Sequence, residues 1–175
     1  MKRLIALVFA VCAAASGAAH PPRRPDLPIV EKAVRLKAGQ YVWNTKADAT
    51  GPVFLVVDLS VQRALLYRNN VPIAASTIST GSDGRETPTG TFTVLQKEVV
   101  HRSRTYDDAP MPYMQRLTWK GVSMHAGHLP GYPASHGCIR LPRGFAKLLY
   151  GVTRLGTTVI ITDRMSSAAS DPPRD

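Results

Sequence analysis

The sequence predicts a mainly β domain, arranged as a sandwich or a barrel, with one short helix. Short runs of β-branched and apolar residues recur through the middle of the chain, separated by Gly, Pro and Asn, as is typical of strands joined by turns. Only one segment has helical spacing, with Phe145, Leu148 and Leu149 on one face. Pro142 suits its first turn, and Gly151 can end it.

The predicted strands begin with a meander. Residues 53–58 and 64–67 are apolar, and Asn69-Asn70 can turn the chain into a third strand at 71–79. Later strands are expected at 91–95, 121–125 and 157–161. The strand at 121–125 delivers His125 at its end.

The first residues have the three parts of an export signal. Lys2 and Arg3 precede an apolar stretch at 4–15, and small residues follow at 16–19. The apolar stretch is too short to cross a bilayer core of about 30 Å, which needs roughly twenty apolar residues. We therefore expect a signal peptide at residues 1–19, no transmembrane segment, and export to the periplasm or cell envelope.

One folded domain is expected after cleavage, at residues 51–165. Residues 20–50 are expected to form a leader and N-terminal segment, and residues 166–175 a flexible tail. A lipoprotein anchored through Cys12 is an alternative, which the bulky Val11 before it disfavours.

The chain is strongly basic. Its formal net charge is +10, and loss of Lys2 and Arg3 with the signal gives 10 − 2 = +8. Such a charge favours an anionic partner such as a membrane surface or a carboxylate-rich wall polymer. Simple solubility is the alternative, and no dense basic run or aromatic signature indicates nucleic acid.

Cys138 is the one cysteine outside the signal peptide, so it has no partner for an internal disulfide. A free thiol is mostly protonated at neutral pH, and a nearby imidazole is needed to take its proton. His136 lies two residues before the sulfur, and His125 lies at the end of the preceding strand. We favour His125, because catalytic bases usually come from a separate element.

Gly137 separates His136 from Cys138. Without a Cβ it permits a sharp turn and lets a substrate carbonyl approach the amides of Gly137 and Cys138, which could form an oxyanion hole. A turn glycine without that role is the alternative, and both readings can hold together.

The Ser-His-Gly-Cys-Ile-Arg run at residues 135–140, with His125 upstream, resembles the signature of the L,D-transpeptidase catalytic domain, the YkuD family. The Thr-Pro-Thr-Gly-Thr-Phe run at 87–92 matches another segment of that family, and residues 57–67 resemble its opening strands. The resemblance covers roughly residues 53–161. The loop between His125 and Ser135 is shorter than the commonest spacing in the family. The pocket is therefore expected to differ in shape from that of the common members.

The resemblance implies a β-sandwich-like catalytic domain acting on peptidoglycan stem peptides, without metal, nucleotide or organic cofactor. It implies Cys138 as nucleophile and His125 as base. The residues that would shape the nucleophile loop and oxyanion site are Ser135, His136 and Gly137. Arg140 stands where the family has Arg or Asn, and would orient this loop, hold a substrate carboxylate bidentately or make only structural hydrogen bonds.

The implied reaction has two halves. Cys138 attacks the carbonyl of the third stem residue, whose centre is L, expels the terminal D-alanine and leaves a thioester. An amine of a second stem, or of a protein acceptor, then takes the acyl group. Water in its place would make the enzyme an L,D-carboxypeptidase. We expect a monomer.

Residues 101–119 form a long irregular stretch before His125, which predicts a substrate-covering flap. Tyr113 is predicted to bind substrate as a wall residue, with Trp119 as a second wall residue. Packing of these aromatic rings into the core is the alternative.

Two other classes of function fit parts of the pattern. A zinc module would use ligand types found at His125, His128, His136 and Cys138. However, residues 136–138 leave little room for two convergent ligands, and the run at 87–92 would have no role. An inactive wall-binding domain would share the fold, but this chain keeps the cysteine and both histidines.

Overall fold

The computed structural model describes residues 28–44 and 50–163. The predicted signal peptide and C-terminal tail lie outside the described residues. The predicted fold class is confirmed, because the described chain forms two sheets and carries a short helix after Cys138. Neither helix in the described ranges is long and apolar enough to cross a membrane.

The described residues form two helices and ten strands. In chain order these are α1 Ile29–Val34, β1 Tyr41–Trp43, β2 Val53–Asp58, β3 Arg63–Arg68, β4 Val71–Thr77, β5 Gly90–Thr93, β6 Gln96–Glu98, β7 Met114–Arg116, β8 Ser123–Ala126, β9 Ile139–Leu141, α2 Arg143–Val152 and β10 Thr158–Thr162.

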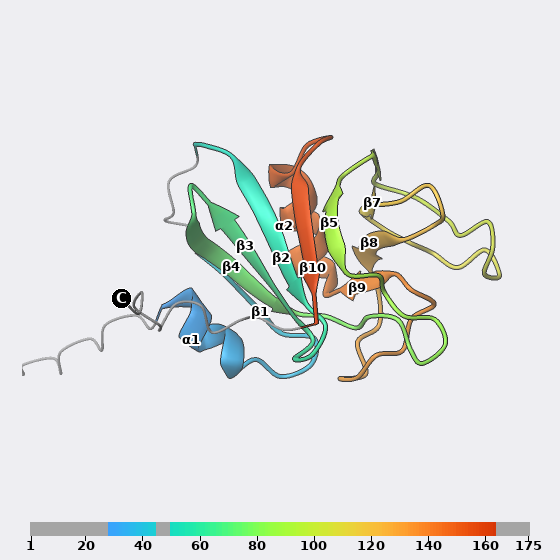
Figure 1. Cartoon of the computed structure of the whole chain (residues 1–175), viewed down its shortest axis with the longest axis horizontal. Coiled ribbons are helices and arrows are strands. Elements are labelled where there is room, and N and C mark those ends of the chain that lie inside the picture. Colours follow the sequence, from blue (N-terminus) through green and yellow to red (C-terminus); the bar gives the residue numbers. More distant parts are fainter. Residues whose placement is uncertain (1–27, 45–49, 164–175) are drawn as a thin grey trace, which may run out of the picture.

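The larger sheet has the order β1-β4-β3-β2-β10-β5 (Figure 1). The predicted meander is confirmed, since β2, β3 and β4 pair antiparallel in succession. The late strand β10 lies parallel to β2 and antiparallel to β5. The strand β10 is therefore inserted between β2 and β5 although it follows all the strands of the second sheet in the chain.

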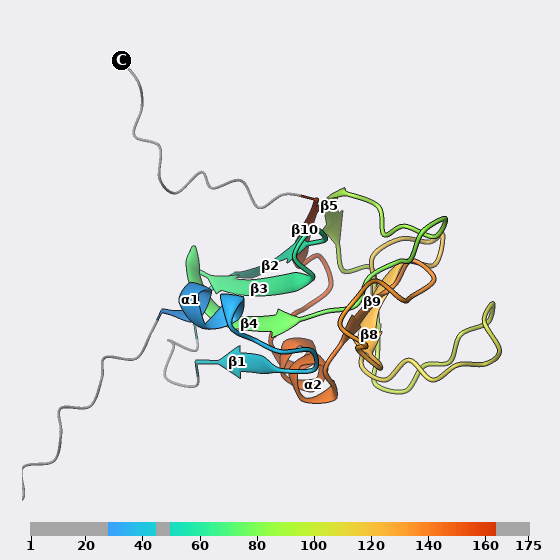
Figure 2. The same cartoon turned by 90° about the horizontal axis from the view of Figure 1, so that it is seen from below.

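The smaller sheet has the order β6-β7-β8-β9 and lies beside the larger one. Its β8 and β9 are parallel, whereas β6, β7 and β8 pair antiparallel. The segment between β6 and β7 projects away from both sheets (Figure 2). The parallel pair matters most, because β8 ends in His125 and Ala126 and β9 directly follows Cys138.

The main core joins the two sheets through α2. Leu66 from β3, Met124 from β8 and Phe145 from α2 are all fully buried in the same cluster. Burial of one such side chain contributes about 1.5–3 kcal/mol. The small sheet is thus packed firmly against α2 and the large sheet, which gives the residues on its other face a rigid base.

Two elements lie in the segment predicted as a leader, α1 and β1. The strand β1 pairs with β4, and Trp43 packs edge-on against Phe145 at 5.7 Å between ring centroids. Ala33 of α1 covers Leu65 and Ala75 on the opposite face of the large sheet. Both elements are too short for a hydrophobic period to indicate them from sequence.

The predicted irregular flap, residues 101–119, is irregular only in part. Met114–Arg116 form β7, the second strand of the small sheet. The strands β6, β7 and β9 have three residues each and carry polar side chains, so period-two alternation cannot be recognised in them.

Candidate active site

His125 and Cys138 lie on the same face of the small sheet. Met124 pairs with Ile139 across β8 and β9, and both are buried in the core. Successive side chains of a strand point to opposite faces. His125 follows Met124 and Cys138 precedes Ile139, so both side chains point away from the core, to the other face of the small sheet.

His125 is held in one tautomer. Its Nδ1 lies 2.9 Å from the carbonyl oxygen of Ala126, which can only accept a hydrogen bond, so Nδ1 carries the proton. Nε2 is then the unprotonated nitrogen and the one able to accept a proton. Burial holds the pKa of His125 below its ordinary value of 6.5, despite the opposing effect of the Ala126 carbonyl, and the positive charge of Arg140 also lowers it.

Cys138 rests as a neutral thiol. Its Sγ donates a hydrogen bond to the carbonyl oxygen of Gly121 at 3.6 Å. Burial raises the pKa of Cys138 above its ordinary value, while the backbone amide of Ser123 and the charges of Arg140 and Arg116 partly offset this effect. A neutral thiol and a neutral imidazole on one face of the sheet fit general-base activation rather than a standing ion pair.

The loop that presents the thiol is tied by Ser135. The Ser135 hydroxyl donates to the carbonyl oxygen of Cys138 at 2.5 Å and accepts from the amide of Gly137 at 3.1 Å. Gly137 has a φ of 105°, which strongly favours glycine. Since its amide already donates to Ser135, the amide of Gly137 could serve an oxyanion only if that bond opened. Among the described residues, no such bond engages the Cys138 amide.

Thr87 supports this loop from the segment that precedes β5, a role that the sequence did not indicate. Its buried hydroxyl donates to the carbonyl oxygen of Gly137 at 3.0 Å and accepts from the amide of Gly81 at 2.9 Å. An added Cβ at Gly81 would lie 2.0 Å from the carbonyl oxygen of Arg85, so this tight turn requires glycine. The Thr-Pro-Thr-Gly run thus contributes to the placement of the nucleophile.

We expect Thr87→Val to destabilise the fold by about 1–3 kcal/mol, because it leaves a buried carbonyl and a buried amide without their partner. Thr87→Ser keeps the hydroxyl and is the matched control, expected to lose much less. Denaturant unfolding monitored by circular dichroism measures both. A Val variant as stable as the wild type would show that the bridge to Gly137 contributes nothing.

Arg140 faces the site from β9, where it pairs with His125. Its backbone exchanges two hydrogen bonds with Ser79, at 2.9 and 3.1 Å. Within the described residues its guanidinium makes no hydrogen bond, so the alternative of a purely structural role through its side chain has no contact to support it. The group is therefore available to an anion.

The other predicted site residues point elsewhere. His136 is exposed, and its ring stacks on Tyr106 of the flap at 4.3 Å between centroids. Tyr113 is half-buried against α2, 6.0 Å from the Tyr150 ring and 5.7 Å from the Arg143 guanidinium. Trp119 is 75% exposed, so it is Tyr113 and not Trp119 that packs into the core.

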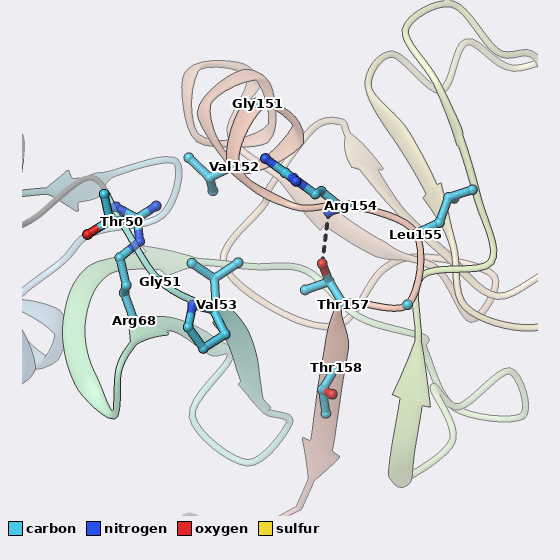
Figure 3. Close-up of a pocket in the computed structure, with 12 residues that line it drawn as sticks. Thr50, Gly51, Val53, Arg68, Gly151, Val152, Arg154, Leu155, Thr157 and Thr158 are labelled. Carbon is cyan, nitrogen blue, oxygen red and sulfur yellow. Dashed lines mark hydrogen bonds between the residues drawn. The ribbon is translucent and has the colours of Figure 1, made fainter.

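A cavity of about 820 Å³ opens away from the thiol, between the starts of β2 and β10 and the end of α2 (Figure 3). Arg68 and Arg154 line it, but neither Cys138 nor His125 does. Among residues 28–44 and 50–163, no three His, Cys, Asp or Glu side chains are grouped so that they could hold a metal ion.

The chain is similar to one family of known proteins. A family model described as YkuD, the L,D-transpeptidase catalytic domain, matches residues 52–161. L,D-transpeptidase 1 of Mycobacterium tuberculosis is 29% identical over 133 residues, covering 66% of this chain and 53% of that protein. The chain thus spans about half the length of the curated relatives it matches.

Solved structures are similar in both fold and sequence. An L,D-transpeptidase from Stackebrandtia nassauensis has a TM-score of 0.59 at 26% identity, covering 66% of this chain and 57% of that one. L,D-transpeptidase 3 from Mycobacterium tuberculosis, in complex with a faropenem-derived adduct, has a TM-score of 0.57 at 26% identity, covering 63% of this chain and 60% of that one.

Proposed function

Because this chain belongs to the YkuD family of L,D-transpeptidase catalytic domains, we propose that it is an exported, cysteine-dependent peptidoglycan L,D-transpeptidase. Its substrates would be the stem peptides of the cell wall. The observation that carries the proposal is that Cys138 shares a face of the small sheet with His125, whose Nε2 is left unprotonated by the Nδ1 contact to Ala126.

In the acylation half, the thiol proton of Cys138 passes to Nε2 of His125 as Sγ attacks the carbonyl of the third stem residue. The C–N bond to the terminal D-residue then breaks, and the His125 imidazolium returns the proton to the leaving amine. The Ala126 carbonyl stabilises the transient imidazolium through Nδ1. The products are a thioester on Cys138 and a free D-amino acid.

In the second half, an amine attacks the thioester carbonyl, His125 takes the amine proton, and the C–S bond breaks to give a new amide and the free thiol. The acceptor would be an amine of a second stem or of a protein. Arg140, with its guanidinium unengaged, would hold a substrate carboxylate, and Tyr113 as a wall residue stays a prediction. The basic surface favours the anionic wall polymer.

Incubation with purified disaccharide-tetrapeptide, followed by mass spectrometry of the products, tests the proposed reaction. We expect cross-linked dimers and free D-alanine. Disaccharide-tripeptide without dimers would identify an L,D-carboxypeptidase, in which water replaces the acceptor amine. No product under conditions in which the protein is folded would contradict both activities and favour an inactive wall-binding domain.

Chelation separates the enzyme from a zinc module. We expect a chelator to leave activity and melting temperature unchanged, since the proposed mechanism routes no step through an ion. A structural zinc would contribute folding free energy that chelation removes. Stoichiometric zinc in the purified protein, with a fall in melting temperature on its removal, would overturn the role of His125 as base.

A further inference from the structure

Arg116 lies in line with the nucleophile across the small sheet. It pairs with Ser123 between β7 and β8, and the backbone amide of Ser123 faces the sulfur of Cys138. Paired residues of neighbouring strands project to the same face. Arg116, Ser123 and Cys138 therefore cross the sheet in one row, with the arginine on the face that bears the thiol.

A chain of polar contacts fixes the Arg116 side chain. Its Nε donates to Oε1 of Gln96 at 2.7 Å, and Nε2 of Gln96 donates to Oε1 of Glu98 at 2.5 Å. The other carboxylate oxygen of Glu98 lies 2.6 Å from Nδ1 of His101. The Glu98 carboxylate thus binds Gln96 and His101 and not the guanidinium nitrogens, although its charge still interacts with that of Arg116.

The outer edge of the Arg116 guanidinium lies near the Trp119 ring and is free of hydrogen bonds in the part of the chain that the structure describes. Within the described residues, Nη1 and Nη2 make no hydrogen bond, although the side chain is half-buried. The exposed Trp119 ring lies 6.0 Å from its central carbon and covers one side. A planar group with donors held in place and unused is suited to bidentate binding of a carboxylate.

The distance between the strands matches one residue of substrate. Neighbouring strands lie about 4.8 Å apart, so the backbones of Arg116 and Cys138 are about 10 Å apart, a gap that one arginine side chain and one substrate residue together can span. The charge of Arg116 already acts on the Cys138 thiol across this gap. An extended residue adds about 3.5 Å. A carboxylate one residue beyond the carbonyl that Cys138 attacks would fall between the sulfur and the Nη atoms.

We propose that Arg116 binds, through Nη1 and Nη2, the free carboxylate of the residue that leaves when the thioester forms. Arg116 is then the residue that selects donors ending one residue after the scissile bond, and Gln96 with Glu98 holds it in position. This inference rests on the proposed function, since it names the recognition of the donor at the same site.

The first test compares a tetrapeptide donor that ends in a carboxylate with the same donor ending in a carboxamide. We expect the wild type to prefer the acid, and Arg116→Gln to lower kcat/KM for the acid by about 10- to 100-fold, the loss typical of a hydrogen bond to a charged group. The carboxamide donor should change little. Arg116→Lys should keep part of the preference, and Arg154→Gln, at the separate cavity, all of it (Figure 3).

The second test requires no peptide turnover. Iodoacetate and iodoacetamide alkylate Cys138 by the same displacement of iodide, but only the first carries a carboxylate. We expect Arg116→Gln to reduce the ratio of the iodoacetate rate to the iodoacetamide rate by about 3- to 10-fold at low salt. Added salt should reduce the same ratio in the wild type. Arg154→Gln should leave the ratio unchanged.

The two tests distinguish a failure of the proposed function from a failure of the inference about Arg116. An enzyme that turns over neither donor, but whose alkylation ratio falls in Arg116→Gln, would refute the proposed function while supporting an anion site at Arg116. An unchanged alkylation ratio in Arg116→Gln and Arg116→Lys would overturn the inference, whatever the turnover. Loss of the acid preference in Arg140→Gln, with the preference kept in Arg116→Gln, would assign the carboxylate to Arg140 instead.

Discussion

Cys138→Ala is expected to abolish cross-linking, with a loss of at least about 10⁴-fold, because the nucleophile cannot be replaced by positioning alone. The fold should survive. The thiol donates a long hydrogen bond to the Gly121 carbonyl, and its side chain is not part of the main hydrophobic core. Circular dichroism and melting temperature measure the fold, and product analysis with the tetrapeptide donor measures the activity.

Covalent labelling by a β-lactam tests independently whether Cys138 is the nucleophile. A relative in the comparisons was solved with a faropenem-derived adduct, so faropenem or a carbapenem is a suited probe. We expect the intact mass of the wild type to rise by one adduct and that of Cys138→Ala to stay unchanged. Cross-linking by the purified alanine variant, or an adduct that survives it, would place the nucleophile elsewhere.

His125→Ala is expected to lower the acylation rate by about 10²- to 10⁴-fold, the contribution typical of a general base. Its pH dependence should change as well. Since the pKa of His125 lies below 6.5, its Nε2 stays unprotonated at neutral pH, and the wild-type rate should fall only on acidification below that value. Without the base, the rate should follow the thiolate and climb about tenfold per pH unit towards the raised pKa of Cys138.

His136→Ala is the matched control for the base. The His136 ring is exposed and stacks on Tyr106, so its loss should loosen the contact between the flap and the nucleophile loop. Some activity and some thermal stability should be lost, but the pH profile of acylation should keep its wild-type form. A profile that shifts in His136→Ala and not in His125→Ala would reverse the two roles.

Much of the fold could be predicted from the sequence because its main strands bury strongly apolar runs. The meander of β2, β3 and β4 is of this kind, and so is α2, whose Phe145 and Leu149 share one buried face. In the small sheet only β8 was predicted, as the strand at 121–125, whereas β6, β7 and β9 could not be. Their three-residue lengths and polar side chains are stabilised by pairing with distant segments, which local patterns do not report.

The candidate site divides in the same way. Cys138 and His125 could be proposed from residue types and order alone, because thiol chemistry needs a base. The support of the loop by Thr87 depends on a contact 50 residues away, and the tautomer of His125 depends on the orientation of one carbonyl group. In the sequence, Arg116 cannot be distinguished from an ordinary surface charge. Only the register of β7 against β8 shows that it lies in line with the sulfur.

The most direct test of the account is to capture the acyl-enzyme itself. Wild-type protein would be mixed with the tetrapeptide donor, quenched in acid within the first turnover, and analysed by intact mass and peptide mapping. We predict one adduct with the mass of the donor minus its terminal D-residue, attached to Cys138. Hydroxylamine should release it, as it releases a thioester, and it should form far more slowly in His125→Ala. Turnover of the donor with no adduct on Cys138 at any quench time, or with the adduct on another residue, would contradict this prediction.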